Sequence, residues 1–210
     1  MKKLVIFDFD GTLADTNEVS YQIYAVMCER YNVPLLTPEE LHDLKKLPVK
    51  ERLKIMSVPL YKVPKLVRQS WDLYYEYMDS VHYFEGIEAL LETLHQHNIK
   101  TVIVSSNHKR NIEAFLSHQR VHYFSEIYGK ARVFGKERLI KKVLKKHRIE
   151  MQDALYVGDE LRDIEACLKL NMPIASVTWG FDRESMLKKL NPEGIANTTE
   201  ELKHIIFETR

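Results

Sequence analysis

Residues 4–13 read LVIFDFDGTL, an apolar run that ends in two aspartates one residue apart. The first four residues are all apolar and include two β-branched ones, which predicts a short strand buried on both faces of a parallel sheet. In an extended segment Asp8 and Asp10 point the same way, and Gly11 permits a tight turn directly after them. The stretch therefore predicts a buried strand that presents two carboxylates at its C-terminal end.

Later segments have the same character as this first strand. Each is short and apolar and is followed by polar residues or glycine: 101–104, 154–157, 174–177 and, more weakly, 124–128. Between them, apolar residues recur at helical spacing, as they do from residue 87 to residue 94. Strands that alternate with helices predict an α/β fold with a parallel sheet and right-handed crossovers.

Residues 16–82 break this alternation, because they contain no convincing strand. Apolar residues at helical spacing around 21–27 and 71–78 indicate two helices, and five prolines divide the remainder into shorter segments. We therefore predict two domains. An α/β core is formed by residues 1–15 and 83–210, and an all-helical domain is formed by residues 16–82.

The composition is that of an ordinary globular protein and excludes several functional classes. Lys and Arg number 31 and Asp and Glu number 30, a net charge of +1, whereas general nucleic-acid binders normally carry a basic excess. Cys28 and Cys167 are far apart, which argues against a thiolate zinc site or a disulfide framework and fits a reducing compartment. The sequence contains no apolar run of 18 residues. We expect a cytoplasmic protein with no nucleic-acid or membrane partner, and the sequence leaves its oligomeric state open.

A second acidic group follows the strand predicted at 154–157. Asp159 and Asp163 are four residues apart and would share one face of a helix that begins in this loop. Ligands of open parallel sheets bind beyond the C-terminal strand ends, and close carboxylates repel one another unless a cation lies between them. Either aspartate alone could cap the helix. Asp8, Asp10 and Asp159 together favour a site for a hard cation with oxygen ligands.

Two further segments could bind an anion. Ser105 ends the strand at 101–104, and its hydroxyl could hold phosphate oxygens together with the backbone N–H groups of Ser106 and Asn107. These residue types are also common helix caps. Lys136 opens another helical segment and is a second candidate, although one lysine among many is weak support by itself.

With these residues assembled, the chain resembles the haloacid dehalogenase-like (HAD) phosphatase superfamily. Its motifs occur in the family's order: DFDGTL at 8–13, Ser105, Lys136, and GDE at 158–160 followed by Asp163. Residues 84–87 are similar to the family's return from cap to core, and residues 179–181 are similar to the tail of phosphoglycolate phosphatase-type members. The resemblance implies a Rossmann-like parallel-sheet core with an inserted all-helical cap of the C1 type.

The resemblance also implies catalytic roles. Asp8 would be the nucleophile that forms an aspartyl-phosphate, and Asp10 would protonate the leaving oxygen and later activate water. Mg2+ would be bound by the Asp8 carboxylate, the Asp10 backbone carbonyl and Asp159. The implied activity is Mg2+-dependent hydrolysis of a small phosphate monoester, such as phosphoglycolate, a sugar phosphate or a nucleotide.

Supporting roles follow from the same resemblance. Ser105, Ser106 and Lys136 would hold the transferring phosphoryl group. Asp163 would support the metal-bound waters or Lys136, and Thr12 would stabilise the turn after the first strand.

Some features leave alternatives open. Lys136 lacks the proline that commonly follows the family's lysine, so Lys130, Lys141 and Lys142 are alternative positions. The family's dehalogenases lack the second aspartate of the first motif, so Asp10 favours phosphoryl transfer over dehalogenation. A phosphomutase or phosphotransferase of the same superfamily and a non-catalytic metal-binding regulatory protein are the alternative functions.

Overall fold

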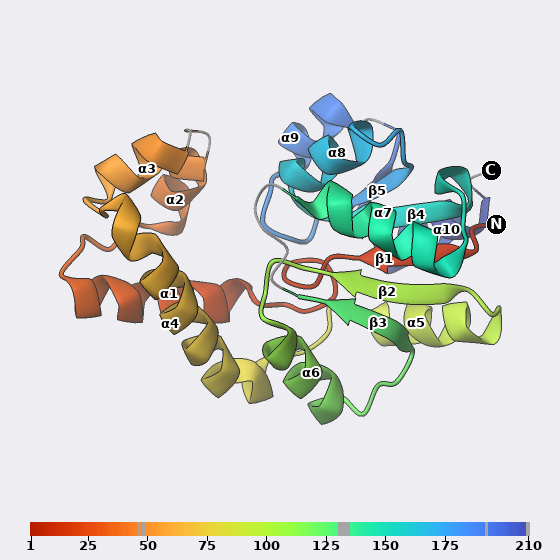
Figure 1. The fold of residues 1–210 in the computed structure, drawn as a ribbon, viewed down its shortest axis with the longest axis horizontal. Helices are drawn as coiled ribbons and strands as arrows, with labels where there is room; N and C mark the ends of the chain where they lie inside the picture. The colour runs from red at the N-terminus through yellow and green to blue at the C-terminus, as the bar shows by residue number, and fades with distance from the viewer. Residues whose placement is uncertain (46, 48, 130–134, 192, 209–210) are drawn as a thin grey trace. The chain divides into compact units, whose positions relative to one another are not determined.

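The computed structural model describes residues 1–45, 47, 49–129, 135–191 and 193–208. The chain divides into two compact units, one formed by Met1–Thr16 with Val81–Arg210 and the other by Asn17–Ser80. In the described residues the first unit contains a sheet with its helices, and the second contains only helices (Figure 1). The interpretation of the second unit as a cap domain, with boundaries at residues 16 and 82, stays a prediction.

Six strands of the described chain form one sheet, in the order β3-β2-β1-β4-β5-β6. They are β1 (Leu4–Phe7), β2 (Lys100–Val104), β3 (Phe124–Tyr128), β4 (Ala154–Gly158), β5 (Ile174–Val177) and β6 (Ile195–Ala196). Each neighbouring pair runs parallel. Strand β1 lies at the centre, with Phe7 opposite Ile103 of β2 and Val157 of β4. The predicted α/β fold with a parallel sheet is confirmed.

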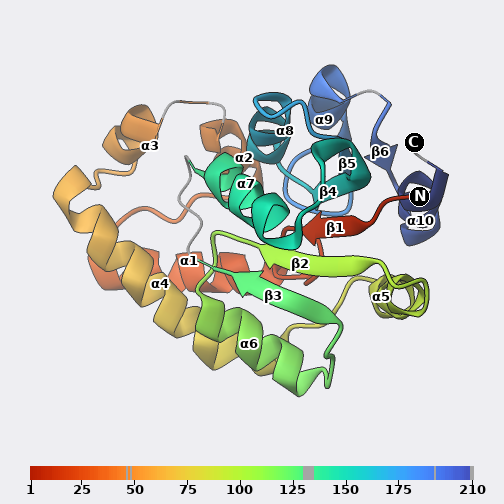
Figure 2. The ribbon, with the colours of Figure 1, turned by 45° about the vertical axis from the view of Figure 1, so that its right-hand side comes forward.

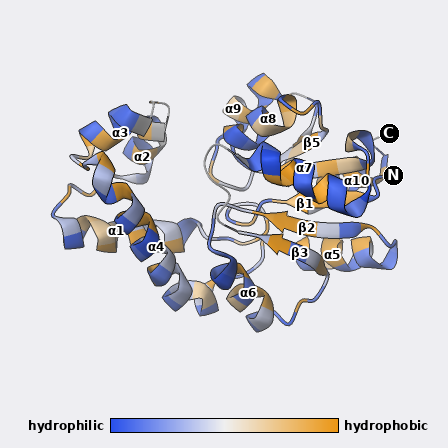
Figure 3. Ribbon diagram, viewed as in Figure 1, coloured by the Kyte–Doolittle hydropathy of each residue, from blue (hydrophilic) through white to orange (hydrophobic). Residues whose placement is uncertain are grey.

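The helices of this unit bury the sheet. They are α5 (Ile87–Gln96), α6 (Lys109–His118), α7 (Lys136–His147), the short 3-10 helix η3 (Met151–Asp153), α8 (Leu161–Leu168), α9 (Glu184–Leu190) and α10 (Thr199–Glu208). On one face, Ile6 packs in a cluster with Val143 of α7 and Cys167 of α8. Val5 and Phe7 point to the opposite face because side chains alternate along a strand, and both are fully buried. Burial on both faces explains the continuous apolar sequence of β1 and of residues 102–104 in β2, whose end is coloured hydrophobic in Figure 3.

The helical unit consists of α1 (Asn17–Tyr31), α2 (Pro38–Lys45), α3 (Val49–Ile55) and α4 (Val63–Tyr77), with 3-10 turns η1 (Leu60–Lys62) and η2 (Met78–Ser80). Helices α1 and α4, which correspond to the two predicted around 21–27 and 71–78, pack against each other and cross (Figure 2). A hydrogen bond between the hydroxyls of Ser20 and Tyr74 joins them. Throughout the described chain, no helix has the length and apolar character needed to cross a membrane.

The strand ends bring distant parts of the sequence together. The Asp8 N–H donates to the Val157 carbonyl (2.8 Å), so the pairing of β1 with β4 extends to the first aspartate. The chain then turns sharply, and Gly11 adopts the left-handed conformation with φ 74°. A Cβ atom on Gly11 would lie 2.3 Å from Asp159 Oδ2, so the turn needs glycine for both its conformation and its close approach to β4.

Candidate active site

Lys136 lies between two buried carboxylates at the end of β1. Its Nζ donates to Asp8 Oδ2 and to Asp163 Oδ1. The side chains are 5% exposed for Lys136, 2% for Asp8 and 0% for Asp163. Burial by itself would lower the pKa of Lys136, but the negative charges of Asp163 and Asp8 outweigh it and raise the pKa above its ordinary value. Lys136 therefore places a stable positive charge beside Asp8.

The alternative lysines lie elsewhere or outside the described residues. Lys142 lies over the Tyr128 ring, 5.4 Å from its centroid, and Lys141 is exposed on the same helix. Lys130 lies outside the described residues. Among the described candidates, Lys136 is the one that contacts the predicted nucleophile, although its role in phosphate binding stays a prediction.

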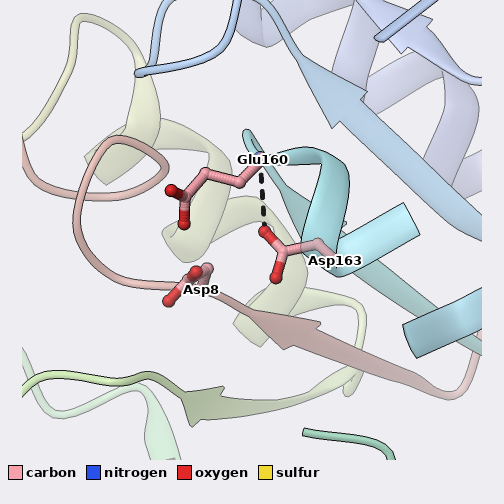
Figure 4. A group of neighbouring side chains, drawn as sticks. All are labelled: Asp8, Glu160 and Asp163. Atoms are coloured by element: carbon pink, nitrogen blue, oxygen red, sulfur yellow. Dashed lines mark hydrogen bonds between the residues drawn. The ribbon is translucent and has the colours of Figure 1, made fainter. Parts of the chain in front are cut away.

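Glu160 joins Asp8 and Asp163 in a carboxylate cluster (Figure 4). One oxygen from each side chain lies within 4.8 Å of the others. The backbone N–H of Glu160, the residue that precedes α8, also donates to Asp163 Oδ2 (3.3 Å). Burial raises the pKa of Asp163 to about 6, an effect that Lys136 opposes and Asp8 reinforces. Glu160 stands in the GDE motif at residues 158–160, but the sequence alone assigned it no role of its own.

Asp159 is fully buried after β4, and its carboxylate faces the loop that follows β1. Oδ1 accepts a hydrogen bond from Thr12 Oγ1 (2.8 Å), and Oδ2 accepts one from the Phe181 backbone N–H (2.8 Å). Burial raises the pKa of Asp159 well above its ordinary value, and the charges of Glu160 and Asp8 raise it further. The structure thus places Asp159 beside the three-carboxylate cluster, with its oxygens bound to Thr12 and Phe181.

Asp10 lies two residues beyond Asp8, and its Oδ1 accepts a hydrogen bond from Asn107 Nδ2 (3.0 Å). Burial raises the pKa of Asp10 to about 7, and the charge of Asp8 adds to the rise while the bond from Asn107 opposes it. A carboxyl group with such a pKa can give or accept a proton near neutral pH, as general acid–base catalysis requires.

Ser105 and Ser106 follow β2, the neighbour of β1 on the side away from β4. Ser105 is fully buried, and its Oγ accepts a hydrogen bond from the Asn107 N–H (3.1 Å). Arg162 Nη2 donates to Ser106 Oγ (3.4 Å) and forms an ion pair with Glu160. The sequence carried no signal for Arg162, because an arginine in the first turn of a helix is usually solvated.

Acidic side chains outnumber basic ones in the described part of this site. Two cationic side chains, Lys136 and Arg162, stand against five carboxyl groups, which belong to Asp8, Asp10, Asp159, Glu160 and Asp163. Carboxylates are the oxygen ligands that Mg2+ prefers, and a divalent cation would offset the excess charge. The donor set therefore fits Mg2+.

Comparison with known families identifies this arrangement. The model of the haloacid dehalogenase-like hydrolases matches residues 5–177, which include every site residue named above except Phe181. The chain belongs to the haloacid dehalogenase-like hydrolases. As a HAD hydrolase the protein is an enzyme, and both the predicted superfamily and the predicted enzyme class of hydrolase are confirmed.

The HAD hydrolase is similar, over nearly its whole length, to a phosphatase in sequence and to two solved structures in fold. It is 25% identical to the phosphoglycolate phosphatase of Synechococcus elongatus, with 94% of each chain covered. A predicted phosphatase from Clostridium acetobutylicum has a similar structure, with a TM-score of 0.85, 25% identity and 99% of each chain covered. CbbY from Rhodobacter sphaeroides, solved in complex with phosphate, shares the fold with a TM-score of 0.75, at 17% identity over 96% of each chain.

Proposed function

We propose that this HAD hydrolase is a Mg2+-dependent phosphatase that hydrolyses a small phosphate monoester through an aspartyl-phosphate on Asp8. The observation that carries the proposal is the environment of Asp8, a buried carboxylate beside the Lys136 ammonium and two residues before Asp10. Similarity to a protein named phosphoglycolate phosphatase supports the substrate class.

In the first step, an oxygen of the Asp8 carboxylate attacks the phosphorus of the monoester. The bond from phosphorus to the leaving oxygen breaks, and Asp10 donates a proton to that oxygen so that the product leaves as an alcohol. Proton transfer from a positioned group typically contributes ~10²–10⁴-fold to the rate. Lys136 offsets the repulsion between the incoming phosphate and the Asp8 carboxylate.

In the second step, water attacks the phosphorus of the aspartyl-phosphate. Asp10, now ionised, removes a proton from this water, and the bond between phosphorus and the Asp8 oxygen breaks. Inorganic phosphate leaves, the Asp8 carboxylate is restored and Asp10 is again protonated. Covalent catalysis divides one difficult substitution into two easier ones in this way.

Ser105, Ser106 and Lys136 are proposed to hold the phosphoryl oxygens. Ser105 and Lys136 are both buried next to the strand ends, which supports the assignment because a hydrogen bond to a charged phosphate is stronger away from water.

Asp8, the backbone carbonyl of Asp10 and Asp159 are the proposed ligands of Mg2+, with Asp163 in support. Glu160 is a further carboxylate in this neighbourhood. A bound Mg2+ would supply positive charge that stabilises the phosphoryl oxygens in the transition state.

The proposed substrates are phosphoglycolate, a sugar phosphate or a nucleotide. We also propose that residues 16–82 act as a C1-type cap whose opening admits substrate and whose closure excludes bulk water, a common arrangement in enzymes that gate their sites.

The test is release of inorganic phosphate from a panel of monoesters by purified protein with Mg2+. We expect Asp8→Asn to abolish turnover, and Asp153→Asn, which alters a partly exposed aspartate paired with Lys3, to retain it. Wild-type turnover in Asp8→Asn would exclude the nucleophile assignment. Transfer of phosphate to an added sugar in preference to water would identify a phosphotransferase instead.

A further inference from the structure

Two buried asparagines connect helix α6 to Asp10. Asn107 lies in the loop after β2 and is 4% exposed, and Asn111 lies in the first turn of α6 and is 0% exposed. Asn107 donates from Nδ2 to Asp10 Oδ1 (3.0 Å), and Asn111 donates from Nδ2 to Asn107 Oδ1 (3.0 Å). A chain of side-chain hydrogen bonds therefore runs from α6 to Asp10.

The directions of these bonds follow from the chemistry of the amide. Asn107 Oδ1 accepts from two donors, the His108 backbone N–H (2.7 Å) and Asn111 Nδ2. If the Asn107 amide were reversed, its NH2 group would face both donors and its oxygen would face the Asp10 carboxylate. The two donors thus fix the amide so that its N–H bonds point at Asp10.

We propose that Asn111 is a positioning residue for Asp10 and acts through Asn107. This inference rests on the proposed function, in which Asp10 transfers the proton. Asn111 is linked to Asp10 through the hydrogen bond that it donates to Asn107. It holds Asn107 in the one orientation that gives Asp10 a hydrogen-bond donor and so fixes the direction of its carboxyl group.

The proposal predicts a dependence on the leaving group. An alkyl phosphate releases a strongly basic alkoxide, which needs a proton from Asp10 as its bond to phosphorus breaks. p-Nitrophenyl phosphate releases a weakly basic phenolate, which leaves without that proton. A misplaced Asp10 should therefore slow the first step much more for alkyl phosphates than for p-nitrophenyl phosphate, because a misplacement of about 1 Å can cost on the order of 10²-fold in rate.

The test compares Asn111→Leu, which keeps the branched shape but removes the donor, with the wild type on both substrates. We expect kcat/KM for the alkyl phosphate to fall by ~10–100-fold, that is, up to the low end of the ~10²–10⁴-fold range for general acid catalysis. We expect kcat/KM for p-nitrophenyl phosphate to stay within about threefold of the wild type, because kcat/KM reports the steps up to release of the leaving group and not the later hydrolysis of the aspartyl-phosphate, in which Asp10 also acts. Asn111→Ser, which is smaller and too short to reach Asn107, should show the same difference if Asn111→Leu folds poorly.

Asn191→Leu is the matched control. Asn191 donates to the carbonyls of Ile174 and Gly194 and to Ser176 Oγ, so its loss disturbs the same unit without contact to Asp10. We expect this control to change both substrates equally.

Three results would count against the positioning role. Equal losses on both substrates in the Asn111 variants, or wild-type rates on both, would overturn it while leaving the proposed function intact. A wild-type protein that releases phosphate from neither substrate would instead overturn the proposed function, and the positioning role with it.

Discussion

Lys136 keeps a positive charge between Asp8 and Asp163, and all three side chains are almost fully buried. Lys136→Met would keep the side-chain length but leave two carboxylates without their shared cation. Removing one partner of a buried ion pair costs ~3–5 kcal/mol, and removing one preorganised donor costs on the order of 10²–10³ in kcat. We therefore expect Lys136→Met to lower the urea midpoint and to reduce kcat for phosphate release by ~10²-fold or more.

The control for this variant is Lys141→Met, at an exposed position of the same helix. Both measurements should stay at their wild-type values in the control. Wild-type kcat in Lys136→Met would show that the charge beside Asp8 is not needed for turnover.

The hydroxyl of Thr12 joins the loop after β1 to β4, because it donates to Asp159 Oδ1 at 2.8 Å and is fully buried. Thr12→Val keeps the shape but leaves that oxygen without its donor, which costs ~1–3 kcal/mol. Urea unfolding should show a loss of this size. In the control Thr93→Val, which loses an exposed bond to the Ala89 carbonyl, the change should stay within about 0.5 kcal/mol. Equal stability losses in the two variants would contradict the assignment.

At the scale of residues, a side chain's place could be predicted from the sequence where the backbone topology determines it. Asp8 and Asp159 could be placed together because each follows a buried strand, and parallel strands end at a common edge. Glu160 and Arg162 could not be paired, because the partner of a long charged side chain depends on its rotamer and on where α8 begins. The contact of Asn111 with Asn107 likewise depends on how α6 starts against the loop.

Strand β3 supports the loop that carries Asn107. A Cβ atom on Gly129, at the end of β3, would lie 2.4 Å from the Lys109 backbone nitrogen and 2.8 Å from the Asn107 carbonyl oxygen. These neighbours are backbone atoms, so Gly129→Ala must displace the loop. We expect a stability loss of ~1–3 kcal/mol in urea unfolding and a lower kcat for alkyl phosphates.

Ser125→Ala provides the comparison for this variant, because Ser125 is exposed on the same strand and loses only its hydrogen bond to the Thr101 carbonyl (2.9 Å). Its unfolding midpoint and kcat should stay close to the wild type. If Gly129→Ala matched it in both, close packing of the loop on β3 would not matter for the site.

At the scale of elements, strands could be predicted from the sequence where the apolar run was long enough to be recognised. The four-residue apolar run of β1 is buried on both faces, which its sequence indicates directly. Strand β6 contains only Ile195–Ala196, and two residues cannot establish a periodicity. Its pairing with β5 comes from tertiary contacts that the local sequence does not encode.

At the scale of the whole molecule, the chain segments just before and just after the helical insertion contact each other within the sheet unit. The Asp15 N–H donates to the His82 carbonyl (2.9 Å), and Ala14 forms an isolated antiparallel bridge with Tyr83. These contacts bring the two ends of the interrupted chain together within one unit. The loss of strand patterning after residue 16 could reveal the insertion, but this pairing of its ends needs the folded structure.

The excess of carboxylates predicts that the folded protein gains stability from a divalent cation. A ligand present at 100 times its Kd stabilises the native state by ~2.7 kcal/mol if the unfolded chain does not bind it. We expect MgCl2 to raise Tm above the value in NaCl of equal ionic strength, and Asp159→Asn to reduce the rise. An identical Tm in the two salts would contradict a Mg2+ site.

The most direct test of the central claim is to trap phosphate on the enzyme during turnover. The Asp10→Asn variant should slow hydrolysis of the intermediate, so acid quenching with labelled p-nitrophenyl phosphate, whose leaving group needs no proton from Asp10, should retain covalent phosphate. Borohydride reduction followed by peptide mass spectrometry would then locate the acyl-phosphate as homoserine at one position. We predict homoserine at residue 8 only. Covalent phosphate on another residue, or steady phosphate release by the wild type without an adduct at Asp8 in either protein, would contradict the account.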